Sequence, residues 1–163
     1  MISGDFWQEP FQLKTISPNW ENAPSGAGIY VVRRDSPIPR VVAEDPKGVL
    51  YVGRSKRLRN RLWQLWKANH PASGFLWGHP KLAGEIMGGI CRSPKDVVDR
   101  VGELTVKVAA PIGPSELEDA ERAVLYAYFY QYGELPPLNF SLPKRWNEPP
   151  SDEWIGWGNE GLT

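Results

Sequence analysis

The sequence predicts an α+β fold, in which a small three-stranded, mainly antiparallel sheet is flanked by helices. Three short segments rich in β-branched and aromatic residues indicate the strands, at residues 28–34, 48–53 and 103–109. Apolar residues at helical spacing follow the second and the third of these segments. The connection between the first two strands has no crossover helix, so we expect these two strands to be antiparallel.

The composition is that of a globular chain that folds without disulfides. The chain has 163 residues, a length typical of one domain, and 41% of them are hydrophobic. The single cysteine excludes an internal disulfide, and two histidines are too few for a histidine-built metal site. No run is long and apolar enough to span a membrane, and no signal-like segment opens the chain. We therefore expect a cytoplasmic protein, in a reducing compartment and without membrane contact.

The first half of the chain predicts a hairpin with a long connection. Residues 1–27 are rich in aromatic residues and proline and predict an irregular lead-in with room for one short edge strand. The first strand, 28–34, is followed by three prolines within 35–47, which predict a long turn. Residues 40–43 can extend the hairpin before the second strand at 48–53.

A helix is expected directly after the second strand. Ser55 is a candidate N-cap, and the helix has an apolar stripe formed by Leu58, Leu62 and Leu65. Two shorter helices are expected beyond it, at Lys81–Ile90 and from Ser93 onward.

The second half predicts a strand, a long helix and a tail. Ser115 and Glu118 have the spacing of a capping box, which predicts a helix that runs to about Tyr132 and stops at Gly133. The tail, 141–163, is rich in tryptophan and shows little periodicity. We expect its tryptophans to pack back onto the core; a partner or dimer surface and a stacking platform for single-stranded bases are the alternatives.

Positive charge is concentrated at the start of the first helix. Between Arg54 and Arg61 there are five cations and no acid. Residues 1–70 carry 11 Lys and Arg against 6 Asp and Glu, whereas residues 71–163 carry 8 against 13. This asymmetry favours a polyanionic partner, although a pair of solvated faces would have the same composition.

Two tripeptides and three single residues resemble the motifs of the GIY-YIG endonucleases. Gly28-Ile-Tyr30 matches the first name-giving motif, and Tyr51-Val-Gly53 matches the second. The segment around Arg61 is similar to that of the bacterial excision-repair nuclease, and Glu121 and Asn139 stand where the family has its metal-binding helix and its asparagine. The resemblance covers residues 28–140 and implies a nuclease core there.

The resemblance implies a metal-dependent DNA endonuclease that leaves 5′-phosphate and 3′-hydroxyl ends. Tyr30 or Tyr51 would be the general base, Arg61 would bind the phosphoryl oxygens, and Glu121 would hold Mg²⁺ or Mn²⁺. Contacts to the DNA are expected from Arg54, Lys56, Arg57 and Asn139.

Physical arguments also favour one tyrosine as the base and one glutamate as the metal ligand. Phenols titrate near ~10, so a base needs a cation beside it, and Arg54, close to Tyr51, favours Tyr51. The capping box accounts for Glu118 but not for Glu121, which favours Glu121 as the metal ligand.

The chain departs from the family where a His or Tyr is common. That position is Leu65, which can move no proton, so a catalytically silent nucleic-acid-binding module is the second hypothesis. The spacing from Tyr30 to Tyr51 and that from Glu121 to Asn139 are also longer than usual. A carbohydrate- or peptide-binding surface built from tryptophans is a third hypothesis. An acidic inhibitor protein and a homodimer are further candidate partners, and the sequence does not choose between restriction, phage defence and a toxin.

Overall fold

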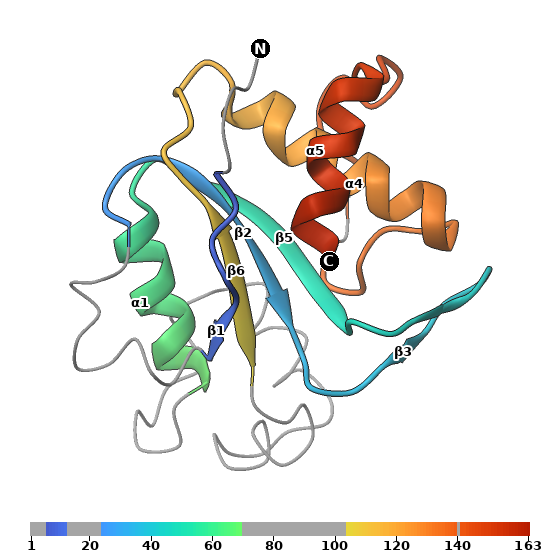
Figure 1. Cartoon of the computed structure of the whole chain (residues 1–163), viewed down its shortest axis with the longest axis horizontal. Helices are drawn as coiled ribbons and strands as arrows, with labels where there is room; N and C mark the ends of the chain where they lie inside the picture. The colour runs from blue at the N-terminus through green and yellow to red at the C-terminus, as the bar shows by residue number, and fades with distance from the viewer. Residues whose placement is uncertain (1–5, 13–23, 70–103, 140) are drawn as a thin grey trace.

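A computed structural model describes residues 6–12, 24–69, 104–139 and 141–163 of the chain (Figure 1). The expected helices at Lys81–Ile90 and from Ser93 onward lie outside these residues. In the part of the chain that is described, no helix is both long enough and apolar enough to cross a membrane.

The expected α+β class is confirmed, but among the residues described the main sheet has four strands and not three. All neighbouring strands are antiparallel, including the pair expected from the sequence. In spatial order the strands are β1 (Phe11–Gln12), β6 (Thr105–Ala109), β2 (Gly28–Arg33) and β5 (Val49–Ser55). The additional strand, β1, has two residues and lies at the edge of the sheet, within the lead-in, where the sequence left room for one short edge strand. It is too short to produce a periodic pattern in the sequence.

The connection between β2 and β5 forms a small hairpin of its own. Its strands are β3 (Ile38–Pro39) and β4 (Glu44–Asp45), which pair with each other outside the main sheet. Residues 40–43, expected to extend the main hairpin, instead form the turn, where Val41 and Val42 are exposed.

The helix α1 (Leu58–Asn69) packs against one face of the sheet (Figure 1). Leu58 and Leu62 are fully buried, as their spacing predicts, whereas the side chain of Leu65 lies outside the described part. Ser55 is not the N-cap of this helix, because it is the last residue of β5. Its hydroxyl accepts a hydrogen bond from the backbone N–H of Arg57 (3.0 Å), which forms a tight turn between strand and helix.

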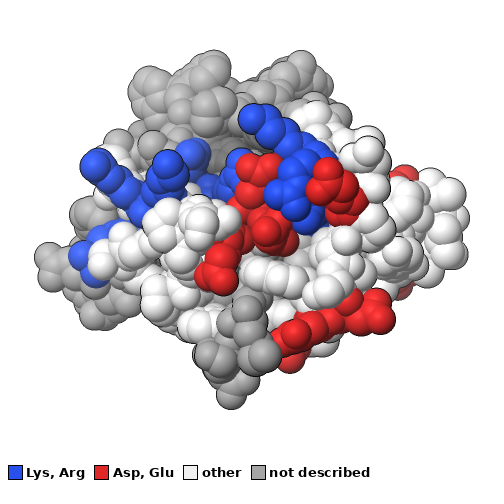
Figure 2. Space-filling view, turned by 90° about the horizontal axis from the view of Figure 1, so that it is seen from above, with Lys and Arg blue, Asp and Glu red and all other residues white. Residues whose placement is uncertain are grey.

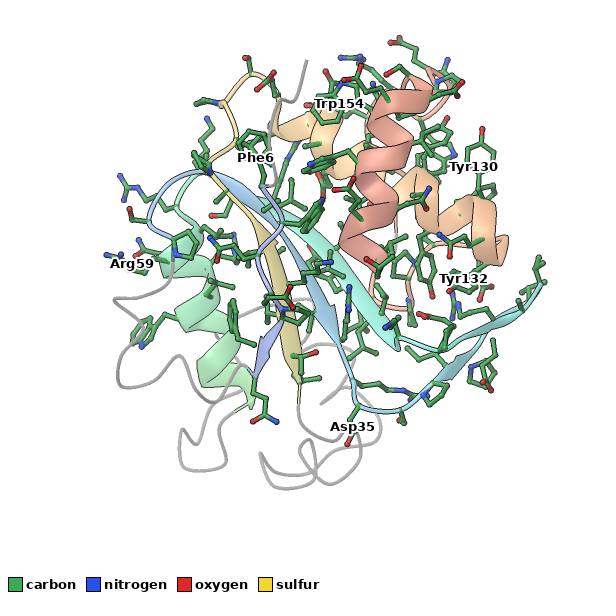
Figure 3. All side chains as sticks on the ribbon, viewed as in Figure 1. Phe6, Asp35, Arg59, Tyr130, Tyr132 and Trp154 are labelled. Carbon is green, nitrogen blue, oxygen red and sulfur yellow. The ribbon has the colours of Figure 1, made fainter. Side chains whose placement is uncertain are left out.

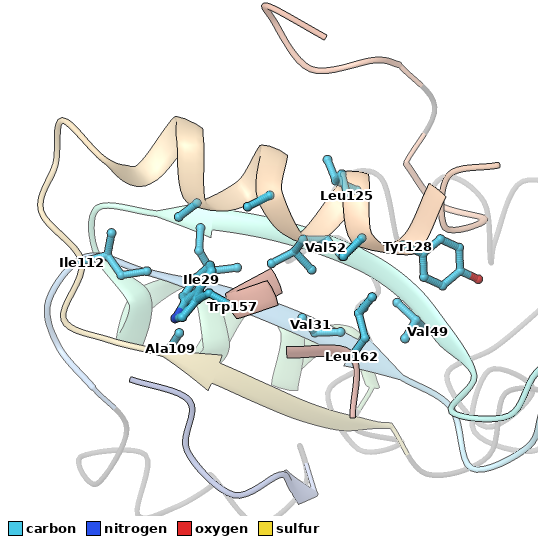
Figure 4. Packing of buried hydrophobic residues seen from close by; sticks show 14 of the residues in the cluster. Ile29, Val31, Val49, Val52, Ala109, Ile112, Leu125, Tyr128, Trp157 and Leu162 are labelled. Carbon is cyan, nitrogen blue, oxygen red and sulfur yellow. The ribbon is translucent and has the colours of Figure 1, made fainter. Parts of the chain in front are cut away.

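The other face of the sheet is covered by α4 (Leu117–Tyr132) and α5 (Asp152–Leu162). Because side chains alternate along a strand, Ile29 and Val31 point to this face and pack with α4 and α5 (Figure 4). As the sequence predicts, α4 ends at Gly133, which has the left-handed conformation (φ 73°).

Helix α5 was not expected, because three glycines give its segment a low helix propensity. Ser151 caps it by accepting a hydrogen bond from the backbone N–H of Trp154. The expectation that the tail packs onto the core is confirmed: Trp157 is buried in the core cluster, and Trp146 and Trp154 pack against it. Tertiary packing therefore stabilises a helix that its own sequence disfavours.

A buried carboxylate anchors the start of β5 to α4. Asp45 is almost fully buried and accepts hydrogen bonds from the backbone N–H groups of Lys47 (2.9 Å) and Val49 (2.8 Å). It also accepts one from the hydroxyl of Tyr128 on α4 (3.0 Å). Burial, and then the charge of Asp45, raises the pKa of Tyr128, so this phenol stays protonated and remains a donor. The contact sets the position of α4 along β5.

We predict that Gly158→Ala destabilises the protein. A β-carbon at residue 158 would lie 2.6 Å from the carbonyl oxygen of Ala123 on α4, so α5 would have to move away. We expect a loss of about 2 kcal/mol in the free energy of unfolding, measured by urea denaturation. Gly156→Ala, in the same helix and with nothing near its added carbon, is the control and should gain up to about 1 kcal/mol. Equal effects of the two substitutions would contradict the close packing of α5 on α4.

Candidate active site

Two tyrosines meet on the face of the sheet opposite to α4. The register of β2 and β5 pairs Tyr30 with Gly53 and Val32 with Tyr51, so both phenols project from the same face on neighbouring strands. Their ring centroids are 6.0 Å apart, and their hydroxyls are hydrogen-bonded to each other. A β-carbon at Gly53 would lie 2.4 Å from the Tyr30 hydroxyl. Glycine at this position is therefore a steric requirement of the tyrosine pair.

Burial is the main influence on both phenols. It raises the pKa of Tyr30 well above the usual value, Tyr51 and Glu121 add to the rise, and Arg61 opposes it. The pKa of Tyr51 is also raised, by burial and then by Glu121, whereas Arg61 and the hydrogen bond from Tyr30 lower it. The signs of the hydrogen-bond effects indicate that Tyr30 donates and Tyr51 accepts. Tyr51, half-buried and stabilised as an acceptor, is thus the better candidate for a base.

Glu121 reaches the tyrosines from α4. This helix packs along β5, an edge strand, and the charge of Glu121 acts on Tyr30 and on Tyr51. Its carboxylate also lies 3.2 Å from Nε of Arg54, near the end of β5. The structure therefore brings Tyr30, Tyr51 and Glu121 together although they lie far apart along the chain.

Arg54 lies between two carboxylates, which corrects two expectations. Its guanidinium pairs with Glu121 and, at 3.4 Å, with Glu118, one helical turn earlier. The cation that lowers the pKa of both phenols is Arg61. The expected capping box is also wrong, because Glu116 is the N-cap of α4 and no side chain caps the helix. Glu118 is therefore part of the site. The capping role that had argued against Glu118 as a metal ligand does not exist.

The remaining predicted cations lie around the start of α1. Arg61 is half-buried, and its charge reaches both phenols. Lys56 and Arg57 are exposed, and Arg59 projects away from the sheet on the outer side of α1 (Figure 3). Viewed from above, Lys and Arg side chains gather on one side of this end of the molecule beside acidic side chains (Figure 2). The surface is therefore mixed in charge, and its positive part follows α1.

Asn139, which was expected to contact substrate, supports the edge strand β5 instead. Its side-chain oxygen accepts a hydrogen bond from the backbone N–H of Val52 (3.0 Å), and its side-chain nitrogen donates to the carbonyl of Val52 (2.9 Å). The backbone N–H of Leu138 donates to the carbonyl of Leu50 (2.9 Å). The oxygen and the nitrogen of the Asn139 side chain thus both bond to the backbone at the open edge of β5, one residue from Tyr51. The geometry makes Asn139 a positioning residue.

The described residues contain no cluster of three or more His, Cys, Asp or Glu side chains that could hold a metal ion. The donors that do meet are the carboxylates of Glu118 and Glu121, which already share a cation, the guanidinium of Arg54. This donor set fits a hard ion such as Mg²⁺, which keeps several waters and binds through one or two carboxylates together with substrate phosphate.

Searches of protein-family models, of curated proteins and of solved structures returned no match to this chain. The resemblance to the GIY-YIG endonucleases therefore rests on the motifs alone.

We predict that Asn139→Ala loosens β5. The substitution removes two hydrogen bonds from an edge strand, at a cost of about 2 kcal/mol in the free energy of unfolding. Hydrogen exchange of the Val52 amide should be faster, while that of the Val31 amide in the neighbouring strand should change little. Unchanged protection of Val52 would show that its amide depends on another partner.

Proposed function

We propose that this protein is a metal-dependent DNA endonuclease with a GIY-YIG-like core. The observation that carries the proposal is the meeting of Tyr30 and Tyr51 with Arg61 and Glu121, which come from two strands and two helices. Phosphodiester hydrolysis needs a base for the attacking water, a cation for the phosphoryl oxygens and stabilisation of the leaving oxygen. The four side chains offer these functions within one site.

Each side chain has a chemical task in this proposal. Tyr51 in its ionised form takes up a proton from the attacking water, or as a neutral phenol orients that water, and Tyr30 supports Tyr51 by donating a hydrogen bond to its oxygen. Arg61 offers its planar guanidinium to two phosphoryl oxygens and favours the ionised form of both phenols. Glu121 would hold Mg²⁺ or Mn²⁺. When bound, this ion stabilises the charge on the leaving 3′ oxygen.

Arg54 would have to change partners in the active state. A divalent ion at Glu121 would compete with the guanidinium for the same carboxylate oxygen. Once released, Arg54 could pair with the substrate phosphate, the contact expected from the sequence. Glu118, its second partner, would keep the guanidinium close by.

A catalytically silent nucleic-acid-binding module is the second candidate. Two observations favour it: both phenols have raised pKa values, and Arg54 already neutralises Glu121. A silent module would retard DNA on a gel and leave it uncut when Mg²⁺ is added.

We predict that the purified protein nicks or linearises plasmid DNA in the presence of Mg²⁺, and that Glu121→Gln reduces the rate by at least about 100-fold. The substitution keeps the shape of the side chain but removes its charge, so DNA binding and the melting temperature should change little. Glu118→Gln is the matched control one turn away and should cost less. Undiminished cutting by Glu121→Gln would place the metal ligand elsewhere, and binding without cutting by the unaltered protein would favour the silent module.

We predict that Arg61→Lys slows cleavage by roughly tenfold or more although it keeps the charge. An ammonium group cannot bind two phosphoryl oxygens in one plane, so the loss should appear in kcat more than in DNA affinity. The measurement is single-turnover cleavage at saturating protein. Full activity of this variant would show that position 61 acts through its charge alone.

A further inference from the structure

Arg61 lines a cavity of about 460 Å³, and two other residues of its lining, Lys56 and Ser115, have no task in the chemistry proposed above. One wall comes from the end of β5 and the start of α1, and the other comes from the turn that leads into α4. The residues that matter here are Arg54, Ser55, Lys56 and Arg61 on the first wall and Ser115 and Glu118 on the second. The turn into α4 lies more than forty residues beyond the end of α1, so this second wall is not apparent from the sequence.

The charge of the cavity suits an anion. Three cations and one carboxylate line it, and that carboxylate, Glu118, is already paired with Arg54 at 3.4 Å. Lys56 is exposed and forms no ion pair with any residue that the structure describes. Lys56 and Arg61 therefore leave the cavity with uncompensated positive charge.

Ser115 supplies a hydroxyl on the opposite wall. Its sequence position predicted an N-cap, but Glu116 takes that place and no side chain caps α4. Ser115 is exposed and lines the cavity, so its hydroxyl can donate a hydrogen bond to a bound group.

We propose that this cavity binds a second phosphodiester group of the DNA, the one that follows the group bound at Arg61 along the same strand. Lys56 and Ser115 contact this second group from opposite walls. Arg61 lies both beside the tyrosine pair and in the cavity wall, so the two positions are contiguous. The volume exceeds that of a phosphate and leaves room for the attached sugar. The inference rests on the proposed function, because it names a second contact to the same strand.

The test is a scan with single methylphosphonates, which replace one charged phosphate at a time on either side of a mapped cut position. We expect one neighbouring substitution to slow cleavage by about tenfold in the unaltered protein and by less than about twofold in Lys56→Gln, where the contact is already lost. Lys47→Gln removes the same charge at the opposite end of β5 and should keep the full sensitivity. Equal sensitivity of Lys56→Gln and the unaltered protein at every position overturns the inference while the nuclease proposal stands.

Ser115→Ala separates a ligand contact from a structural one. We expect weaker DNA binding with an unchanged melting temperature, whereas a capping serine would cost about 1 kcal/mol of stability. A lower melting temperature with unchanged binding would overturn the role of Ser115 as a contact.

A binding measurement keeps the inference testable if the protein does not cut. The slope of log affinity against log salt for duplex DNA should fall by about one unit in Lys56→Gln and stay unchanged in Lys47→Gln. That result without cleavage would support the second contact and overturn the nuclease. If a nucleoside monophosphate binds the unaltered protein but not Lys56→Gln, while the salt slope is unchanged, the cavity takes a free nucleotide and the inference is wrong.

Discussion

The antiparallel register of β2 and β5 is the constraint on which the candidate site depends. It places Tyr30 opposite Gly53 and thereby puts both phenols on one face, while Ile29, Val31 and Val52 point to the core on the other. A slip of one residue would exchange the two faces, burying phenols against α4 and exposing the aliphatic side chains. The burial of the core face therefore holds the tyrosine pair in place.

The second determinant is an electrostatic balance at the end of β5. Arg54 stands between Glu118 and Glu121 and pairs with both, and in the register of β5 it lies on the face opposite to the two phenols. Glu121 favours the protonated phenols, whereas Arg61 opposes it. In the proposed nuclease, a metal ion bound by Glu121 would lower the pKa values of both phenols and compete with Arg54 for this carboxylate.

Residues distant from the site keep its parts aligned. Asp45 ties the beginning of β5 to Tyr128 on α4, and Asn139 pairs the outer edge of β5 at Val52. Beside α4 on the same face of the sheet, α5 packs closely against it through Gly158. These contacts outside the site fix the strand with Tyr51 and the helix with Glu121, which suits a site that must hold its groups in a narrow range of positions.

Short-range patterns determined much of the fold on their own. β-branched and aromatic residues marked β2, β5 and β6, the leucine spacing marked α1, and Gly133 marked the end of α4, because each signal acts within a few residues. The sequence also singled out the two tyrosines, Arg61 and Glu121, by resemblance to known motifs. Contacts between distant segments decided the rest: β1 forms by pairing with β6, α5 by burying Trp157, and Asn139 turns to Val52. Glu118 joined the site for the same reason, since an ion pair to Arg54 depends on how α4 packs along β5.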